Sequence, residues 1–212
     1  YMRYPDMADN YLEKRMEELR SGKTTAPRAA SAGIRKGILQ FPLPEKRVLV
    51  TGGAHAPGLA IAREFIRAGC RVAIFDPDTD AGHTLALNEG IRYHPADLSD
   101  SSATAYAFRA LLKAWRDVDI VVCADRDGCE AILSEWSAHK KRFPIPSDYG
   151  VRLISVGFSP DRPERLTDEI PGLVASDITA PQGTSGYEQE IARACLFISL
   201  PTTRHNCRIM FT

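Results

Sequence analysis

Val48-Leu49-Val50-Thr51-Gly52-Gly53-Ala54-His55-Ala56-Pro57-Gly58-Leu59-Ala60 decides the fold of this chain. An apolar run comes first, a glycine-containing turn follows, and a helical pattern begins at Pro57. A buried strand, a tight turn and a helix N-terminus with free N–H groups form the usual cradle for the pyrophosphate of a dinucleotide. The stretch therefore predicts the first strand and helix of a Rossmann-like α/β domain.

The bulk composition favours one α/β domain and excludes some partners. The chain has 212 residues, of which 44% are hydrophobic, enough for a full core. Its 27 lysines and arginines balance 27 aspartates and glutamates, so no basic surface for nucleic acid is expected. No apolar run approaches the roughly 20 residues that a membrane span needs. We expect neither nucleic-acid binding nor a membrane segment.

The cysteines and histidines show no metal-binding or disulfide pattern. The five cysteines never form a C-x-x-C pair, and most lie in apolar runs, as buried free thiols do. The five histidines have no metal-ligand spacing with one another or with the cysteines. The sequence therefore predicts no metal site and a reducing, cytoplasmic location.

The first 46 residues differ from the rest of the chain. Residues 6–20 are charged, with apolar side chains at helical spacing, and 21–44 are rich in small residues, glycine and proline. The helix either lies on its own domain or packs on a second subunit. We therefore divide the chain into an N-terminal helix and linker arm, 1–46, and a Rossmann-like domain, 47–212, and expect a homo-oligomer.

From Arg47 onward, short apolar runs alternate with helical patterns. This alternation predicts a doubly wound parallel sheet of about six strands in the order 3-2-1-4-5-6. The expected strands are 47–51, 71–75, 91–94, 118–123, 151–157 and 207–211, and the helices are 57–68, 79–88, 99–115, 131–141 and 188–200. Ser99 is the expected cap of helix 99–115. Its expected inward stripe is Ala103, Ala107, Ala110, Leu111 and Ala114.

Four motifs carry a family resemblance. They are Thr51-Gly52-Gly53 with Gly58, Asp76 after the second strand, Ala96-Asp97-Leu98 after the third, and Asp119-Ile120-Val121-Val122 in the fourth. Together they resemble the short-chain dehydrogenase/reductase family, and residues 188–198 and 207–211 are similar to its last helix and strand. The resemblance implies a Rossmann fold, a nicotinamide dinucleotide and an oligomer.

The resemblance assigns roles to residues on both sides of the glycine turn. Gly52 and Gly58 permit the turn and close helix packing, and Gly53 adds freedom. His55 either donates to a phosphate or is a solvated loop residue. Ala56 stands where the family has glycine, and its methyl group is expected to weaken phosphate binding.

Further cofactor residues are expected after the later strands. Asp76 either accepts the ribose hydroxyls, which favours NAD over NADP, or belongs to a plain turn. Asp97 either contacts the adenine amino group or caps the next helix. Ala124 lies in Cys123-Ala124-Asp125-Arg126, where the family has Asn-Asn-Ala-Gly.

The family's catalytic group is not found. Only residues 123–150 separate the fourth strand from Val151, whereas the catalytic strand, two helices and their loops need roughly 40 residues or more. In one alignment 150–154 is the family's sixth strand and the catalytic segment is deleted. In the other, 151–157 is the serine-bearing strand, with Ser155 or Ser159 as the serine. Tyr187 then has Ile191 where the lysine belongs, and no Tyr-x-x-x-Lys occurs in the chain.

Three functions compete. The leading hypothesis is a degenerate family member that keeps the scaffold, and a weak NAD site, without the family's acid/base catalysis. The second is an active NAD-dependent oxidoreductase that uses other groups, such as Arg126 with His139 or Tyr149. The third is an oligomeric scaffold that binds no nucleotide.

Overall fold

The computed structural model of the chain describes residues 43–125, 127–144, 150–157, 170, 172–179, 186–203 and 205–211. The expected helix 6–20 and nearly all of the linker lie outside these residues. Within the described part of the chain, no helix is long and apolar enough to cross a membrane.

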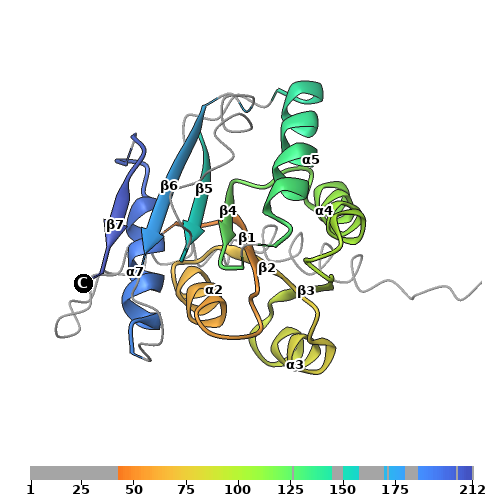
Figure 1. Ribbon diagram of the computed structural model, residues 1–212, viewed down its shortest axis with the longest axis horizontal. Coiled ribbons are helices and arrows are strands. Elements are labelled where there is room, and N and C mark those ends of the chain that lie inside the picture. The colour runs from red at the N-terminus through yellow and green to blue at the C-terminus, as the bar shows by residue number, and fades with distance from the viewer. Residues whose placement is uncertain are drawn as a thin grey trace, which may run out of the picture. The chain divides into compact units, whose positions relative to one another are not determined.

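Seven strands form one parallel sheet in the order β3-β2-β1-β4-β5-β6-β7 (Figure 1). Their bounds are β1 Arg47–Thr51, β2 Arg71–Asp76, β3 Arg92–Pro95, β4 Ile120–Cys123, β5 Val151–Val156, β6 Leu173–Thr179 and β7 Arg208–Met210. The predicted order of the first five strands is confirmed. β1, β2, β4 and β5 are buried at nearly every position and mainly apolar, as expected for a parallel sheet covered on both faces.

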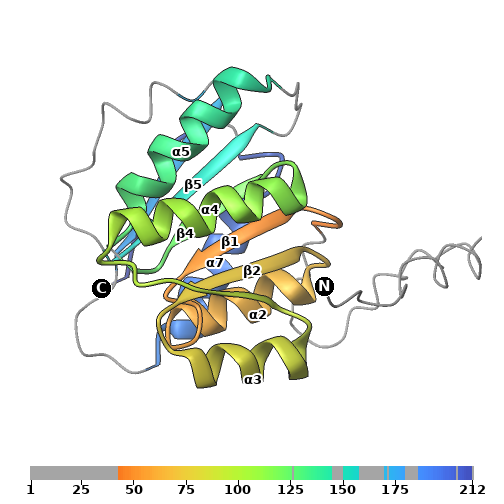
Figure 2. The same cartoon turned by 90° about the vertical axis from the view of Figure 1, so that its right-hand side faces the viewer.

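Helices cover both faces of the sheet (Figure 2). The helices are α2 Gly58–Arg67, α3 Thr79–Glu89, α4 Ser101–Trp115, α5 Cys129–Arg142 and α7 Glu188–Ile198. One core cluster joins the sheet to α2, α3 and α7, and a second joins its other face to α4 and α5. The predicted doubly wound architecture is therefore confirmed.

Strand β6 corrects the sequence prediction of six strands. Residues 173–179 lie where no strand was predicted, but they pair with β5 on one side and β7 on the other. Val151–Val156 pairs with β4 and so takes the fifth place in the sheet. The alignment that made residues 150–154 the sixth strand is therefore wrong.

Helix α4 begins later than predicted and buries a different stripe. Asp100, and not Ser99, is its cap, because the Asp100 carboxylate accepts from the N–H groups of Ser102 and Ala103 at 2.8 and 3.2 Å. The buried residues are Thr104, Ala107, Phe108, Leu111, Leu112 and Trp115. The alanine stripe fails at Ala103, Ala110 and Ala114 because the larger side chains, one position away, take the core face.

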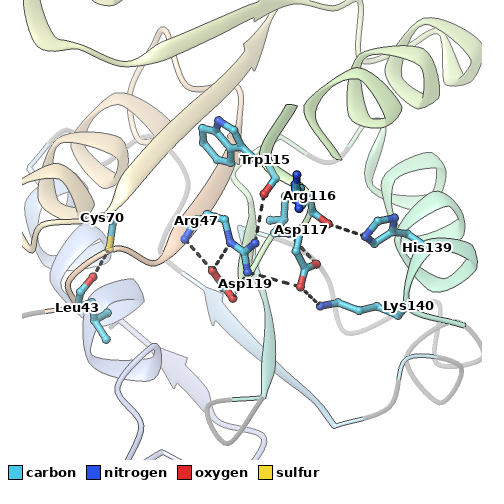
Figure 3. Close-up of polar contacts among 10 residues, drawn as sticks. Leu43, Arg47, Cys70, Trp115, Arg116, Asp117, Asp119, His139 and Lys140 are labelled. Carbon is cyan, nitrogen blue, oxygen red and sulfur yellow. Dashed lines mark hydrogen bonds and ion pairs between the residues drawn. The ribbon is translucent and has the colours of Figure 1, made fainter. Parts of the chain in front are cut away.

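A polar network ties together the N-terminal edge of the sheet (Figure 3). The Arg47 guanidinium donates to both oxygens of Asp119 at 2.8 and 2.9 Å. The Lys140 ammonium donates to buried Asp117 at 2.7 Å, and His139 contacts the carbonyl oxygen of Arg116 at 3.0 Å. These contacts join the start of β1 to the residues before β4 and to the last turn of α5. They lie at the edge opposite the glycine turn.

Candidate functional site

The candidate site lies at the C-terminal edge of the sheet, between β1 and β4. Strand order reverses there, because β1 leads outward to β2 and the chain returns to β4 on its other side. Ligands of open α/β sheets bind in the crevice at such a switch point. The glycine turn after β1 and the turn after β4, Ala124–Gly128, form its two sides.

The glycine turn is held by packing that leaves no room for side chains. A Cβ on Gly58 would lie 2.2 Å from the carbonyl oxygen of Gly52, and one on Gly53 would lie 2.4 Å from Cγ2 of Ile74. Gly52 has φ +61°, a left-handed conformation that favours glycine. The helix therefore starts directly against the turn, as the pyrophosphate cradle requires. Gly53 is a packing residue and does not add the freedom expected from sequence.

The turn after β4 bonds directly to the end of β1. The Thr51 hydroxyl donates to the Asp125 carbonyl at 3.3 Å and accepts from the Asp125 N–H at 3.2 Å. Ala124 is half-buried against the core cluster that includes α2. Arg126 lies outside the described residues. The bonds between Thr51 and Asp125 join the end of β1 to the turn after β4.

Asp76 is the buried acid of the site, with 2% of its surface exposed. One of its carboxylate oxygens accepts from the N–H of Ala54 at 2.9 Å, and the other accepts from the N–H of Asp78 at 2.9 Å. The side chain thus joins the end of β2 to the glycine turn. Each oxygen keeps further acceptor capacity, because a carboxylate has about four lone-pair sites.

The side chains of His55 and Asp78 pair with each other and so connect the glycine turn to the residues after β2. Nε2 of His55 lies 3.0 Å from a carboxylate oxygen of Asp78, and both side chains are well exposed. Asp78 also caps α3 by accepting from the N–H of Ala81 at 3.0 Å. The pKa of Asp78 lies below its ordinary value, because the Ala81 N–H and the His55 ring both favour the carboxylate. Asp78 is therefore anionic at neutral pH. The His55 ring pairs with this acid but stays 63% exposed, so both expected roles of His55 stay open.

Asp97 is exposed beyond the end of β3 and does not cap α4. Its carboxylate accepts from the hydroxyl of Ser99 at 2.6 Å and from its N–H at 3.0 Å. These two bonds hold the pKa of Asp97 below its ordinary value. The expected capping role is wrong because Asp100 fills it, so the side chain of Asp97 remains accessible at the edge of the sheet.

The candidate serine and tyrosine lie on opposite faces of the sheet. Ser155 is opposite Cys123 in the register of β4 and β5. It shares a strand face with Val151 and Leu153, which pack against α4 and α5. Tyr187 precedes α7 and packs on the other cluster, with its ring 5.7 Å from that of Phe211. The structure therefore places these two described residues on different faces of the sheet and shows no contact between them. Ser159 lies outside the described residues.

Sequence reasoning missed three features of this edge. The bond from Thr51 to Asp125 and the bridge from His55 to Asp78 depend on how distant loops meet, which no local pattern reveals. The third feature is a short contact between the thiols of Cys123 and Cys129, whose Sγ atoms lie 2.8 Å apart. Its only sequence signal is a cysteine at each end of a turn between a strand and a helix.

The first half of the domain matches a known family. Residues 46–124 match the model described as short chain dehydrogenase. "Short chain dehydrogenase/reductase dpmpG" of Macrophomina phaseolina is 36% identical over 93 residues, covering 38% of this chain and 49% of that protein. Sorbitol dehydrogenase of Cereibacter sphaeroides is 34% identical over 86 residues, covering 38% of this chain and 32% of that protein. The matches thus span half or less of these curated relatives.

A solved structure shares the fold over a longer range. The Pseudomonas aeruginosa RhlG/NADP active-site complex superimposes with a TM-score of 0.66, covering 81% of this chain and 96% of that one. Sequence identity is 17%, so this likeness concerns the fold alone.

Proposed function

Because the chain belongs to the short-chain dehydrogenase/reductase family, we propose that it binds a nicotinamide dinucleotide, NAD in preference to NADP, without the family's acid/base catalysis. The dinucleotide would lie across the C-terminal edge of the sheet, from the third strand to the β1–β4 crevice. Such a protein acts as a binding, sensing or assembly component.

The loss of catalysis is inferred from the residues that connect β5 to β6. By resemblance, the helix with Tyr-x-x-x-Lys follows the serine-bearing strand, and β5 occupies the place of that strand. Residues 157–172, which connect β5 to β6, contain neither tyrosine nor lysine. Without a lysine beside it, a tyrosine keeps a pKa near 10, and an alcohol has no acid/base at neutral pH.

The residues at the strand ends fit a dinucleotide in stated roles. The glycine turn and the start of α2 would hold the pyrophosphate, and Asp76 would accept the ribose hydroxyls beside its two N–H donors. Asp97 would face the adenine and Ala124 the nicotinamide ribose. When bound, the nicotinamide ring supplies a hydride acceptor or donor.

The carboxylate of Asp76 supports NAD over NADP. A 2′-phosphate would enter beside two acids, Asp76 and the anionic Asp78, and would be repelled by both. The solved RhlG complex contains NADP, but its likeness to this chain is one of fold.

Two features support weak binding. His55 follows Ala54, and Asp78 supplies the other N–H that donates to Asp76, so the His55–Asp78 pair lies beside the expected ribose site. A bound ribose has to displace or accommodate this pair. In addition, the N–H of Leu59 already donates to the carbonyl of His55 at 2.7 Å, so part of the helix N-terminus is engaged by its own loop.

The alternative, an active enzyme that uses other groups, is weakened by the position of one of its candidate residues, His139. His139 lies in the last turn of α5 and contacts Arg116 at the N-terminal edge of the sheet. It is therefore remote from the β1–β4 crevice. Arg126 and Tyr149 lie outside the described residues.

A paired binding and turnover experiment tests the proposal. Fluorescence titration with NADH first gives the concentration that saturates the full chain. Oxidation or reduction of the nicotinamide is then followed by absorbance at that concentration, with a panel of alcohols and ketones. We expect saturable binding and no turnover above the buffer rate. Turnover that Arg126→Ala abolishes would favour the enzyme, and absence of binding at millimolar NADH would favour the scaffold without nucleotide.

A further inference from the structure

Two cysteines face each other across the turn that follows β4. Cys123 is the last residue of β4 and is fully buried, whereas Cys129 is the first residue of α5 and is half-buried. The thiol of Cys123 donates to Sγ of Cys129, and the two sulfur atoms are 2.8 Å apart. Both are free thiols in the structure.

The strand and the helix that carry these cysteines hold the thiols together. Asp125, inside the connecting turn, is bonded through its backbone to Thr51, and its carboxylate accepts from the N–H of Asp127 at 3.1 Å. A Cβ on Gly128 would lie 3.0 Å from a methyl group of Thr104 on α4, so the start of α5 is packed closely. A covalent S–S bond measures about 2.05 Å, so its formation needs only a small movement of two side chains.

We propose that Cys123 and Cys129 form a dithiol site that a small-molecule disulfide of the glutathione type converts reversibly into an intramolecular disulfide. The inference is independent of dinucleotide binding, because it rests on the two thiols and the turn between them.

The exchange proceeds in two steps that balance. The Cys129 thiolate attacks one sulfur of oxidised glutathione, whose S–S bond breaks and releases one glutathione thiolate. The sulfur of Cys123 then attacks Sγ of Cys129, the bond from Sγ to glutathione breaks, and the proton of Cys123 passes to the leaving glutathione thiolate. Two protein thiols are oxidised, and one glutathione disulfide is reduced to two thiols.

The order of the two steps follows from exposure and charge. Cys129 is the thiol that solvent reaches. The hydrogen bond with Cys129, burial and the nearby Asp125 charge together raise the pKa of Cys123 well above its ordinary value. Cys123 therefore resolves the mixed disulfide and does not start the reaction.

The other three cysteines provide internal controls. Burial raises the pKa of Cys70 to about 12 and also raises that of Cys195, so both stay protonated at neutral pH. Cys207 is half-buried, as Cys129 is, and its thiol donates to the carbonyl of His205 at 3.4 Å. It is the matched control for exposure without a thiol partner.

Arg126 allows a direct test, because trypsin cleaves between the two cysteines. The full chain is incubated with oxidised glutathione, free thiols are blocked with N-ethylmaleimide in denaturant so that buried thiols also react, and the digest is analysed by mass spectrometry. We expect the peptides 117–126 and 127–140 to appear joined by a disulfide, with two of the five cysteines protected from alkylation. Dithiothreitol should separate them and restore both thiols.

Three variants identify the roles of the thiols. Cys123→Ser should accumulate the glutathione adduct on residue 129, since the resolving thiol is gone. Cys129→Ser should leave Cys123 unmodified, and Cys207→Ser should give the joined peptides as the wild type does. The proposal is overturned if the wild type yields separate, fully alkylated peptides, or if Cys70 or Cys207 acquires glutathione as fast as Cys129.

Discussion

At the scale of single residues, the glycines of the turn after β1 act through packing. Gly58→Ala would place a methyl group 2.2 Å from the carbonyl oxygen of Gly52, and only a shift of α2 or of the turn can relieve that contact. We expect a loss of about 2–3 kcal/mol in the free energy of unfolding, measured by urea denaturation.

Gly90→Ala is the control for this substitution. Gly90 has φ +69°, but a Cβ there meets nothing within 4 Å. Its expected cost is about 1 kcal/mol, from the left-handed backbone alone. Equal costs at positions 58 and 90 would contradict the packing argument.

Ala56 is an exposed residue of the same turn, and its methyl group lies where the family has glycine. Ala56→Gly should tighten NAD⁺ binding about tenfold, which corresponds to about 1.4 kcal/mol, if the methyl group obstructs the phosphate. Calorimetric titration of the variant and the wild type measures the difference. Unchanged affinity would show that the phosphate does not approach this residue.

Residues differ in how far sequence alone determines their roles. Asp76 could be selected from its place after an apolar strand, because ligand-binding acids commonly stand there. The two N–H groups that donate to Asp76, and the pairing of His55 with Asp78, could not be predicted from sequence, since these groups lie in loops that meet only in the folded chain. The thiol contact of Cys123 and Cys129 needs the same three-dimensional information.

At the scale of elements, α5 depends on a buried charge at its last turn. Lys140 donates to Asp117, and the side chains are 9% and 3% exposed. Lys140→Met would leave the Asp117 carboxylate buried without its closest cation. We expect a loss of about 3 kcal/mol in the free energy of unfolding.

Lys113→Met, on the exposed side of α4, is the matched control. It removes the same charge from the surface and should change the free energy of unfolding by less than about 0.5 kcal/mol. Similar losses in the two variants would mean that the buried pair does not stabilise α5.

The elements that sequence patterns predicted are those with strong periodicity or continuous apolar runs. Strands β1, β2, β4 and β5 were found within two residues at either end because they are buried on both faces. Strand β6, Leu-Val-Ala-Ser-Asp-Ile-Thr, has neither a continuous apolar run nor a strict alternation, and glycines and prolines lie close to it; it is a strand through its pairing with β5 and β7. Because β6 was not predicted, one alignment took residues 150–154 as the sixth strand and sought the catalytic segment in residues 123–150.

At the scale of the whole molecule, acid should unfold the protein partly through carboxylates with lowered pKa. Burial opposes ionisation of Asp119, but its bonds from the Arg47 side chain and backbone outweigh burial and lower its pKa. A carboxyl group of this kind stabilises the fold above its unfolded pKa of about 3.9, and the contribution is lost as pH falls through the lower folded value.

Urea denaturation of the wild type and Asp119→Asn between neutral and strongly acid pH measures this contribution. The variant should be less stable at pH 7, and the difference should shrink below about pH 4 as the wild-type carboxylate is protonated. A difference that stays constant with pH would mean that the charge of Asp119 does not stabilise the fold.

The proposal that Asp76 holds a nicotinamide dinucleotide is tested most directly by calorimetric titration of the full chain with NAD⁺ and NADP⁺. Asp76→Ala is titrated in parallel, with Asp80→Ala as the control, because Asp80 is exposed on the first turn of α3. Circular dichroism first checks that each variant is folded. We predict that NAD⁺ binds at least about tenfold more tightly than NADP⁺, and that Asp76→Ala removes this preference while Asp80→Ala keeps it. Equal or tighter binding of NADP⁺ by the wild type, or no heat with either dinucleotide at millimolar concentration, would contradict the proposal.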